Sequence, residues 1–568
     1  MEMIASTPAV FPRWRRPTIA VAFVLIVATI VWKAWLAEDS YIGFRMLDNL
    51  IHGYGLRWNV YERVNAITNP LWIFLNLPLY VVSGNVFFAT FFTGSILVVA
   101  TWVLLFRRMA RDWDVVAGVI LLPLLFSKTY TDFMVSGLET PLSVFLVAAF
   151  AVEYLYGTPG RSADARLTRL ALIAALGGLS RPDLPVFFIP PLVAFVHQHR
   201  IPVRHLLRSG LLGGFPLLAW AAFCFVYYGF PLPNTYYMRL TTGIPARDYY
   251  KQGLLYVLDL VRRDPISAII ISLALGAGIL VFTVLFRESA AISIAAAGLE
   301  GEIKLVIGWS AGIALLVVYV LRVGGDFMAG RFFLIPIFAS SLLLGILASW
   351  FLNGASMHRR ARVLMGVGAI TFVVFVLPRP QLPFGYEETG IADEKIYYAS
   401  TNDLRNLSWT NGPSKHIWSI RGMEARERAN RSTGGIVAIA SNIGMLGYYG
   451  GPRVGLIDGL GHTDAFLARL PVTGAWRIGH FQREIPEGYF ESVRSGSVVA
   501  GFDPALEGFY RNLRFVTSGP VFSWDRIKAA VELNSGRYRP DIEAYRKRVI
   551  ASRPAPTFVP PGSHPPPS

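Results

Sequence analysis

Long apolar runs, separated by short polar loops, recur through the first two-thirds of the chain and stop near Pro378. A membrane core of about 30 Å takes roughly 20 helical residues to cross, and several runs approach that length. The shorter runs need tilting or burial against neighbouring helices. The pattern predicts an α-helical polytopic domain over 1–378 with about eleven transmembrane helices, at 17–36, 86–106, 113–127, 141–156, 167–179, 184–197, 209–227, 266–286, 303–321, 332–351 and 363–378.

Two further segments are apolar or amphipathic but do not fit a span. Residues 70–82 are apolar and short, which favours an interfacial or re-entrant helix, and residues 249–263 are amphipathic. Residues 379–552 have mixed polarity, with β-like runs at 435–440 and 454–458, and predict a soluble mixed α/β domain. The Pro-rich stretch 553–568 predicts a disordered tail.

Composition supports a membrane protein and excludes several other classes. The 568 residues are 53% hydrophobic and only 16% charged, with a mean hydropathy of +0.45. The net charge of +16 comes from basic residues spread over loops that flank the apolar runs, and no nucleic-acid motif accompanies them. Cys224 is the single cysteine, so an intrachain disulfide is excluded.

The loops that concentrate Lys and Arg predict the orientation, because cytoplasmic loops hold the excess. A cytoplasmic N-terminus places the loops near 107–111, 161–169, 199–208 and 359–362 inside. The basic pair Arg262 and Arg263 is the exception, because this orientation places it outside. The loops 37–85, 128–140, 180–183, 228–265 and 322–331 then face outward, as does the chain after 378. The run 17–36 is too long for a secretory signal core and lacks a small-residue cleavage site, so we interpret it as an anchor.

Two adjacent carboxylates, Glu38 and Asp39, stand where the first predicted span leaves the membrane. Such groups are costly to desolvate, which makes them candidates for function, although they could simply mark the polar end of a helix. Glycosyl transfer needs a carboxylate base that takes a proton from the acceptor hydroxyl. Asp39 is our first candidate for that base, with Glu38 beside it.

The residues after this pair form a series of motifs. Residues 38–45 read Glu-Asp-Ser-Tyr-Ile-Gly-Phe-Arg, and Gly-Tyr-Gly-Leu at 53–56, Asn59, Glu-Arg-Val at 62–64 and Thr-Asn-Pro-Leu-Trp at 68–72 follow. Other outward loops add Ser-Gly-Leu-Glu-Thr-Pro-Leu at 136–142, Ser-Arg-Pro-Asp at 180–183, Pro-Asn-Thr-Tyr-Tyr at 233–237, Gly-Gly-Asp-Phe-Met-Ala-Gly-Arg at 324–331, and Gly-Leu-Gly-His-Thr-Asp and Arg-Ile-Gly-His at 459–464 and 477–480.

Each motif alone is weak, but their joint order on one face is specific. The series resembles membrane glycosyltransferases of the GT-C class, in particular the actinobacterial terminal β-(1→2)-arabinofuranosyltransferases and their relatives in other bacteria. Asp39 matches the second aspartate of their Asp-Asp pair, and Glu38 replaces the first. The resemblance extends over nearly the whole chain except the Pro-rich tail.

The resemblance implies a polyprenyl-phosphate sugar as donor, an envelope glycan as acceptor, and a bacterial inner-membrane location with the active site periplasmic. Arginines bind phosphate oxygens through a planar fork, so the candidates for the donor phosphate are Arg45, Arg181, Arg239 and Arg331. The candidates for sugar or acceptor contacts are His52, Asn59, Glu139, Asp183, Asn234, Asp326 and His480. Glu139, Asp183 and Asp326 could also ligate a divalent cation through oxygen, and the sequence leaves metal dependence open.

The resulting hypothesis is an inverting transfer of arabinofuranose from polyprenyl phosphate to an envelope glycan. Transfer of another lipid-linked sugar to lipopolysaccharide or protein would use much the same architecture. A lipid-linked glycan transporter is a second alternative, but transporters place charge near the bilayer midplane and often show repeated halves, and neither feature is found here. A catalytically silent scaffold is a third, suggested only by Glu38.

Overall fold

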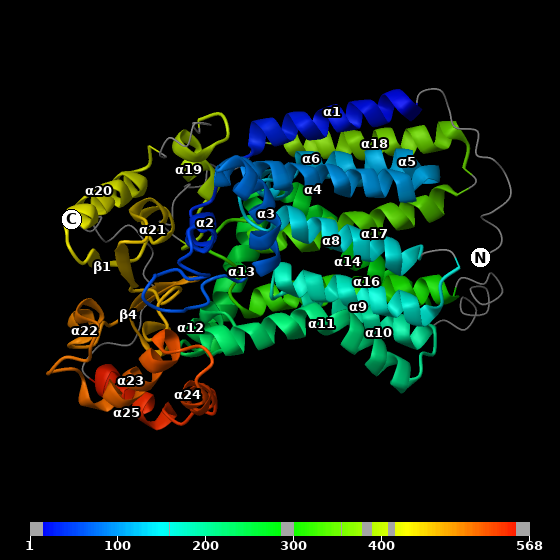
Figure 1. Cartoon of the computed structure of the whole chain (residues 1–568). Helices are drawn as coiled ribbons and strands as arrows, with labels where there is room; N and C mark the ends of the chain where they lie inside the picture. Colours follow the sequence, from blue (N-terminus) through cyan, green and yellow to red (C-terminus); the bar gives the residue numbers. More distant parts are fainter. Residues whose placement is uncertain are drawn as a thin grey trace.

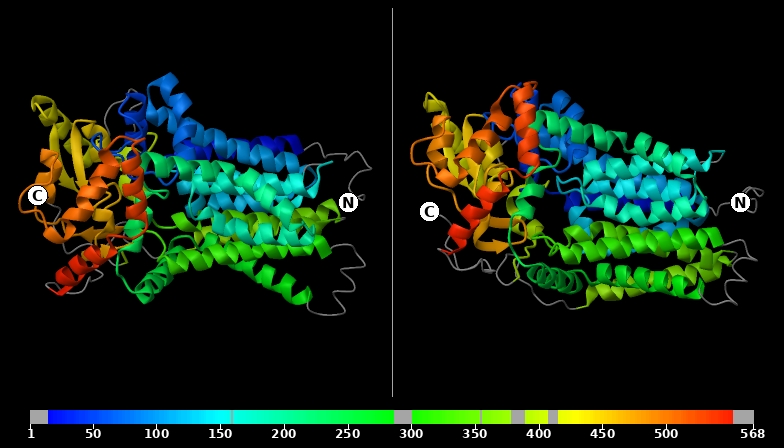
Figure 2. Two further views of the ribbon diagram at one scale, coloured as in Figure 1. Left: turned by 60° about the horizontal axis from the view of Figure 1, so that its bottom comes forward. Right: turned by 90° about the horizontal axis from the view of Figure 1, so that it is seen from below.

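The apolar runs fold into long helices that lie side by side, with an outer region at one end (Figure 1). The computed structural model describes residues 15–157, 160–285, 300–353, 355–377, 389–406 and 415–551. The predicted boundary near 378 and the predicted tail at 553–568 lie outside the described residues. Two further views show the same arrangement, with the start of α1 at the end of the bundle away from the outer region (Figure 2).

Each of the eleven predicted segments coincides with helical structure over most of its length. The helices are α1 (Arg15–Lys33), α4 (Val86–Arg108), α5 (Trp113–Val115) with η3 (Val116–Leu121) and α6 (Leu122–Phe126), α8 (Thr140–Leu155), α9 (Ala163–Ser180), α10 (Leu184–Gln198), α11 (Val203–Tyr228), α14 (Pro265–Leu285), α16 (Glu300–Arg322), α17 (Leu334–Leu352) and α18 (Met357–Val376). The predicted segment 113–127 is not one regular helix, because η3 is a π-helical stretch between two short α-helices.

Six segments in the described chain are long and apolar enough to cross a membrane, which indicates a membrane protein. They are Arg15–Lys33, Val86–Arg108, Val203–Tyr228, Pro265–Val284, Gly301–Arg322 and Arg331–Leu352. Pro70–Ser83, Thr140–Leu155 and Leu184–Gln198 are shorter apolar helices. A count of eleven spans therefore remains a prediction.

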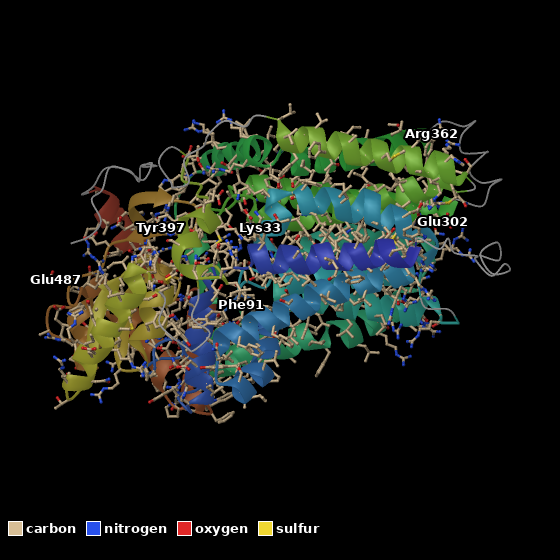
Figure 3. All side chains as sticks on the ribbon, turned by 90° about the horizontal axis from the view of Figure 1, so that it is seen from above. Lys33, Phe91, Glu302, Arg362, Tyr397 and Glu487 are labelled. Carbon is tan, nitrogen blue, oxygen red and sulfur yellow. The ribbon has the colours of Figure 1, made fainter. Side chains whose placement is uncertain are left out.

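Side-chain chemistry divides the bundle into bands. Oxygen and nitrogen atoms gather at its two ends, near Lys33 at one and near Glu302 and Arg362 at the other, and carbon dominates the middle (Figure 3). On α11, Leu211 and Phe215 are about two-thirds exposed, at 64% and 67%. Side chains of this kind on the outside of a bundle fit contact with lipid.

Five further helices cap the end of the bundle that meets the outer region. They are α2 (Ser40–Ile51), α3 (Pro70–Ser83), α7 (Lys128–Phe133), α12 (Asn234–Leu240) and α13 (Ala246–Arg263). The predicted helical segments at 70–82 and 249–263 correspond to α3 and α13. In Figure 1, α2, α12 and α13 lie between the bundle and the outer region.

The outer region is mixed helix and strand, as predicted. Its strands are β1 (Ile436–Ala440), β2 (Val454–Asp458), β3 (Val472–Arg477) and β4 (His480–Arg483), where β1 pairs in parallel with β2 and β3 pairs antiparallel with β4. Its helices are α19 (Glu394–Asn402), α20 (Ile417–Arg431), α21 (Gly444–Gly450), α22 (Tyr489–Ser495), α23 (Pro504–Ser518), α24 (Trp524–Asn534) and α25 (Arg539–Ala551). The two β-like runs predicted from sequence are β1 and β2.

Buried side chains from α2 and the following loop join the bundle to the outer region. Arg45 donates to the carbonyls of Gly447 at 2.9 Å and Val454 at 2.6 Å. Asn59 pairs with the backbone of Leu456 in both directions, at 3.0 and 3.1 Å. Because each bond is buried, the loss of either partner would leave a costly unsatisfied group.

Candidate active site

A cleft opens where the capping helices meet the outer region. It has an open volume of about 620 Å³ and is lined by the start of α2, the loop before α3 and the first turn of α3, the loop before α8, α12, Arg331 and the loop after β2. The lining residues are Asp39, Ser40, Ile42, Gly43, Ala66, Ile67, Thr68, Asn69, Trp72, Ile73, Gly137, Leu138, Glu139, Thr235, Arg331 and His462. We call this space the cleft.

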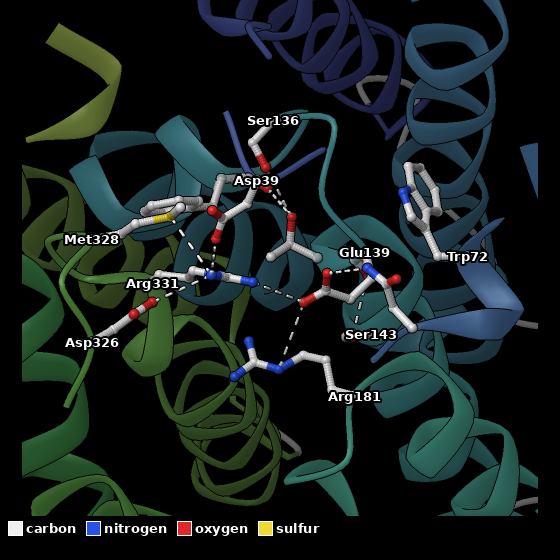
Figure 4. A network of polar contacts seen from close by, with 12 residues as sticks. Asp39, Trp72, Ser136, Glu139, Ser143, Arg181, Asp326, Met328 and Arg331 are labelled. Atoms are coloured by element: carbon white, nitrogen blue, oxygen red, sulfur yellow. Dashed lines mark hydrogen bonds and ion pairs between the residues drawn. The ribbon is translucent and has the colours of Figure 1, made fainter. Parts of the chain in front are cut away.

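Arg331 is the centre of the charged groups in the cleft (Figure 4). Its Nη1 lies 3.6 Å from an Asp39 carboxylate oxygen and 3.5 Å from one of Asp326, and its Nη2 lies 3.6 Å from Glu139. Three carboxylates from three distant loops thus surround one guanidinium. Burial raises the pKa of Asp326 above its ordinary value, although Arg331 opposes the shift.

Glu139 is held from several sides. The amide of Asn69 donates to it at 2.8 Å, and Nε of Arg181 lies 4.0 Å from its other oxygen. Arg181 in turn forms two hydrogen bonds with Asp183, at 3.0 and 2.7 Å. Burial alone would raise the pKa of Asp183, but Arg181 holds it below the ordinary value. Arg181 and Asp183 therefore support the cleft from behind Glu139.

Asp39 differs from the other two carboxylates in its exposure. Its side chain is 34% exposed, whereas those of Glu139 and Asp326 are 4% and 3% exposed. Asp39 precedes the first turn of α2, yet its side chain does not cap that helix. Within the described residues, Arg331 is its only side-chain partner. The Asp39 carboxylate is therefore the one most available to a bound molecule.

Gly137 allows the loop before α8 to approach α2. Its φ is +77°, and a Cβ built there would lie 2.6 Å from Ser40 Oγ. The indole of Trp72 donates to its carbonyl at 3.0 Å, which fixes the loop beside the cleft. A side chain at 137 would be strained in both conformation and space.

Gly137→Ala is expected to destabilise the protein by about 1–3 kcal/mol and to lower any activity that depends on the cleft. The measurement is the thermal midpoint in detergent, with Gly84→Ala as the control. Gly84 has a φ of +63° but open space around its Cβ position, so it reports conformational strain alone. Equal losses in the two variants would contradict the crowding at Ser40.

Glu38 points away from the cleft. Its carboxylate accepts a hydrogen bond from the backbone N–H of Met445 at 3.1 Å, at the start of α21, and the residue is 9% exposed. Burial, reinforced by Asp39, raises the pKa of Glu38 from 4.5 to about 8. The structure gives Glu38 a place in the contact with the outer region.

Glu38→Gln is expected to remove a pH-dependent loss of stability. The unfolded chain releases this proton near pH 4.5 and the folded chain near pH 8, so stability from this group falls as pH rises between those values and is constant above. The variant should gain roughly 2–4 kcal/mol relative to the native chain at pH 8.5. Thermal midpoints at pH 5 and 8.5 measure the gain, and an advantage independent of pH would contradict the shift.

Three other candidates are buried and bind backbone. Arg45 also donates to the carbonyl of Trp58 at 2.8 Å, so its guanidinium is occupied by three carbonyls. Asn59 is paired with β2, as described above. Asn234 donates to the carbonyls of Gly461, His462 and Asp464 at 2.9, 3.1 and 3.1 Å. None of these three side chains lines the cleft, and of the three only Asn234 positions the backbone of a lining residue, His462.

The remaining candidates lie at different distances from the cleft. His52 is exposed at the end of α2, where it contacts Asp48. Arg239 is exposed on α12, and its charge opposes the rise in the pKa of Asp326. The ring of His480 packs against the ring of Phe327, with centroids 4.7 Å apart. Its centroid lies 6.4 Å from that of His462, which lines the cleft.

Several cleft residues were not selected from sequence. Asn69, Trp72, Thr235 and His462 belong to the motifs quoted above, but only tertiary structure shows that they line one space. A metal site is not evident in the described ranges, where no three His, Cys, Asp or Glu side chains are close enough together to hold an ion. The guanidinium of Arg331 lies between the carboxylates instead.

Comparisons with known proteins agree with the motif series. No protein-family model matches the chain, and no solved structure matches it. A terminal β-(1→2)-arabinofuranosyltransferase of Mycobacterium tuberculosis is 26% identical over 524 residues, which is 80% of this chain and 82% of that protein. A protein of the same name from Corynebacterium glutamicum is 25% identical over 532 residues, which is 79% of this chain and 73% of that protein. The chain is thus a relative of the terminal β-(1→2)-arabinofuranosyltransferases along about four-fifths of its length.

Proposed function

We propose that this protein is a membrane glycosyltransferase that transfers arabinofuranose from a polyprenyl-phosphate donor to a cell-envelope glycan. The names of its relatives support the sugar and the reaction. The observation that carries the proposal is the one-third exposed Asp39 carboxylate, opposite Arg331, in a cleft at the end of an apolar bundle. A lipid-linked donor can reach such a cleft from the bilayer.

The chemistry assigns Asp39 the role of general base. Its carboxylate takes the proton from an acceptor hydroxyl while the hydroxyl oxygen forms a bond to the anomeric carbon. The bond from that carbon to the phosphate oxygen breaks, and the polyprenyl phosphate leaves with the electron pair. A single displacement of this kind inverts the anomeric configuration.

The leaving phosphate needs positive charge near the cleft. Arg331 is shared among three carboxylates, and its side chain lines the cleft, where a phosphate oxygen can contact it. Arg239 is exposed, and within the described chain no carboxylate lies within ion-pair distance of it. We assign the phosphate contacts to Arg331 and Arg239, with Glu139 and Asp326 holding Arg331 in place.

A donor panel tests the proposal. Purified protein in lipid nanodiscs is incubated with polyprenyl-phosphate arabinofuranose, mannose or aminoarabinose and an arabinofuranose oligosaccharide, and the new anomeric linkage is determined by NMR. We expect transfer from the arabinofuranose donor with inversion. Transfer of only another sugar would overturn the arabinose assignment, and retention of configuration would overturn the single displacement. Movement of intact lipid-linked glycan across vesicles without transfer would favour a transporter.

A further inference from the structure

A second pocket lies in the outer region and shares no lining residue with the cleft. It encloses about 550 Å³ between the start of the 61–69 loop, the segment after β2, α22 and α23. Its lining residues are Tyr61, Glu62, Ala465, Phe466, Tyr489, Ser492, Val493, Gly496, Tyr510, Leu513, Arg514, Thr517 and Ser518. Figure 1 shows α22 and α23 at the side of the outer region away from α19 and α20. We call this space the outer pocket.

Aromatic rings form one wall of the outer pocket. Phe466 packs against Tyr489 and Tyr510 with ring centroids 4.7 and 4.9 Å apart, and the two tyrosines are 5.3 Å apart. These rings are buried, whereas Tyr61 at the rim is 39% exposed. A rigid aromatic wall with a few polar groups is the usual lining of a site for a small organic ligand.

The polar groups of the outer pocket have unused hydrogen-bonding capacity. The Glu62 carboxyl receives one hydrogen bond, from the Asn59 amide at 3.2 Å, and Asn59 is itself fixed by β2. Among the residues that the structure describes, the Tyr510 hydroxyl and the Arg514 guanidinium have no hydrogen-bond or ion-pair partner. The pocket therefore offers donors and an acceptor on fixed supports.

The charges around the outer pocket favour an uncharged ligand. Burial, reinforced by the neighbouring Asp464, raises the pKa of Glu62 above its ordinary value, so its carboxyl keeps more of its proton near neutral pH. Asp464 lies beneath the aromatic wall, where Tyr489 donates to it at 2.7 Å. Burial likewise raises the pKa of the Asp464 carboxyl above its ordinary value. A ligand rich in hydroxyl groups matches this mixture better than an ion.

Two chain segments connect the outer pocket to the cleft. Glu62 lines the pocket and Ala66 the cleft, and Phe466 lines the pocket and His462 the cleft. Each pair is four residues apart, so its Cα atoms are separated by at most about 14 Å. The two spaces therefore lie within the length of a short oligosaccharide.

We propose that the outer pocket binds a neutral sugar residue of the acceptor glycan, at a distance from the residue that receives the new sugar. That the bound glycan is an acceptor rests on the proposed function, whereas the binding of a neutral glycan does not. The pocket would select acceptors of several residues over short ones. Its residues touch no reacting atom.

The test measures binding of a neutral arabinofuranose hexasaccharide to the full chain in nanodiscs by ligand-observed NMR. The variants are Arg514→Ala, Tyr510→Phe and their combination. Arg511→Ala is the matched control, because Arg511 stands on the same helix but pairs with Glu507 on the surface. We expect affinity about tenfold lower in the combined variant and unchanged in the control. In the transfer assay, the same variant should raise KM for the hexasaccharide and leave kcat and KM for a disaccharide unchanged.

The outcomes separate the two proposals. Equal hexasaccharide affinity in all variants, or binding only of a uronic acid hexasaccharide, would overturn the outer pocket as a neutral sugar site. In either case, transfer to short acceptors would leave the proposed function standing. Binding that depends on Arg514 and Tyr510, with no transfer from any donor, would support the pocket and overturn the transferase assignment.

Discussion

Replacing Asp39 with Asn is expected to lower kcat by about three orders of magnitude, the usual contribution of a general base. The amide cannot take the acceptor proton, but it has nearly the shape of the carboxylate and leaves Arg331 its ion pairs with Glu139 and Asp326. Folding and donor binding should therefore survive. The measurement is kcat at saturating donor and acceptor, with the thermal midpoint and donor affinity determined on the same preparations.

The matched control is Asp48→Asn, on α2, the helix that directly follows Asp39. Asp48 contacts His52 and the Tyr80 hydroxyl and does not line the cleft, so its loss should change kcat by less than about threefold. Near-native turnover in Asp39→Asn would rule out Asp39 as the base. Equal losses in both variants would point to a general disturbance of α2.

Replacing Arg331 with Met is expected to destabilise the protein by about 3–5 kcal/mol and to abolish transfer. The change leaves Asp39, Glu139 and Asp326 without their shared cation, and the last two are almost completely buried. Breaking a buried ion pair from one side costs this much because the remaining charge is uncompensated. The measurement is the thermal midpoint in detergent at pH 7.

Arg322→Met makes the same change at an exposed arginine at the end of α16 and should shift stability by less than about 0.5 kcal/mol. Adding Asp326→Asn to Arg331→Met should recover part of the lost stability, because it removes one of the buried charges. A native-like midpoint for Arg331→Met would contradict the central role of this guanidinium. So would a double variant less stable than Arg331→Met alone.

The sequence predicts the helical segments well because each apolar run is long, and a long apolar run is compatible with few structures other than a helix. The strands β1 and β2 were predicted for a related reason, since short β-branched runs between glycines have few alternatives. The sequence also allows the prediction that Asp39, Glu139, Asp326 and Arg331 lie at the same end of the bundle, because short loops between membrane helices must meet there. The irregular α5–η3–α6 segment could not be predicted, because no local signal marks a π-helical stretch.

Side-chain partners far away in the chain could not be predicted. Arg45, Asn59 and Asn234 stand in the same motifs as the cleft residues, yet each binds backbone of the outer region. A polar residue in a motif is equally suited to hold a loop or to contact a ligand, and only the fold decides. Asn69 and His462 show the reverse case, since their positions in the cleft depend on segments that meet only in the folded chain.

The hydrogen bonds of Arg45 can form only late in the synthesis of the chain. Its acceptors Gly447 and Val454 follow it by 402 and 409 residues. At a synthesis rate of 5–20 residues per second, they emerge about 20 to 80 s after Arg45 itself. Until then α2 lacks the contacts that fix it beside the cleft. A nascent chain therefore has no finished site, and the cleft is completed only after the C-terminal region has been made and delivered to the same side of the membrane.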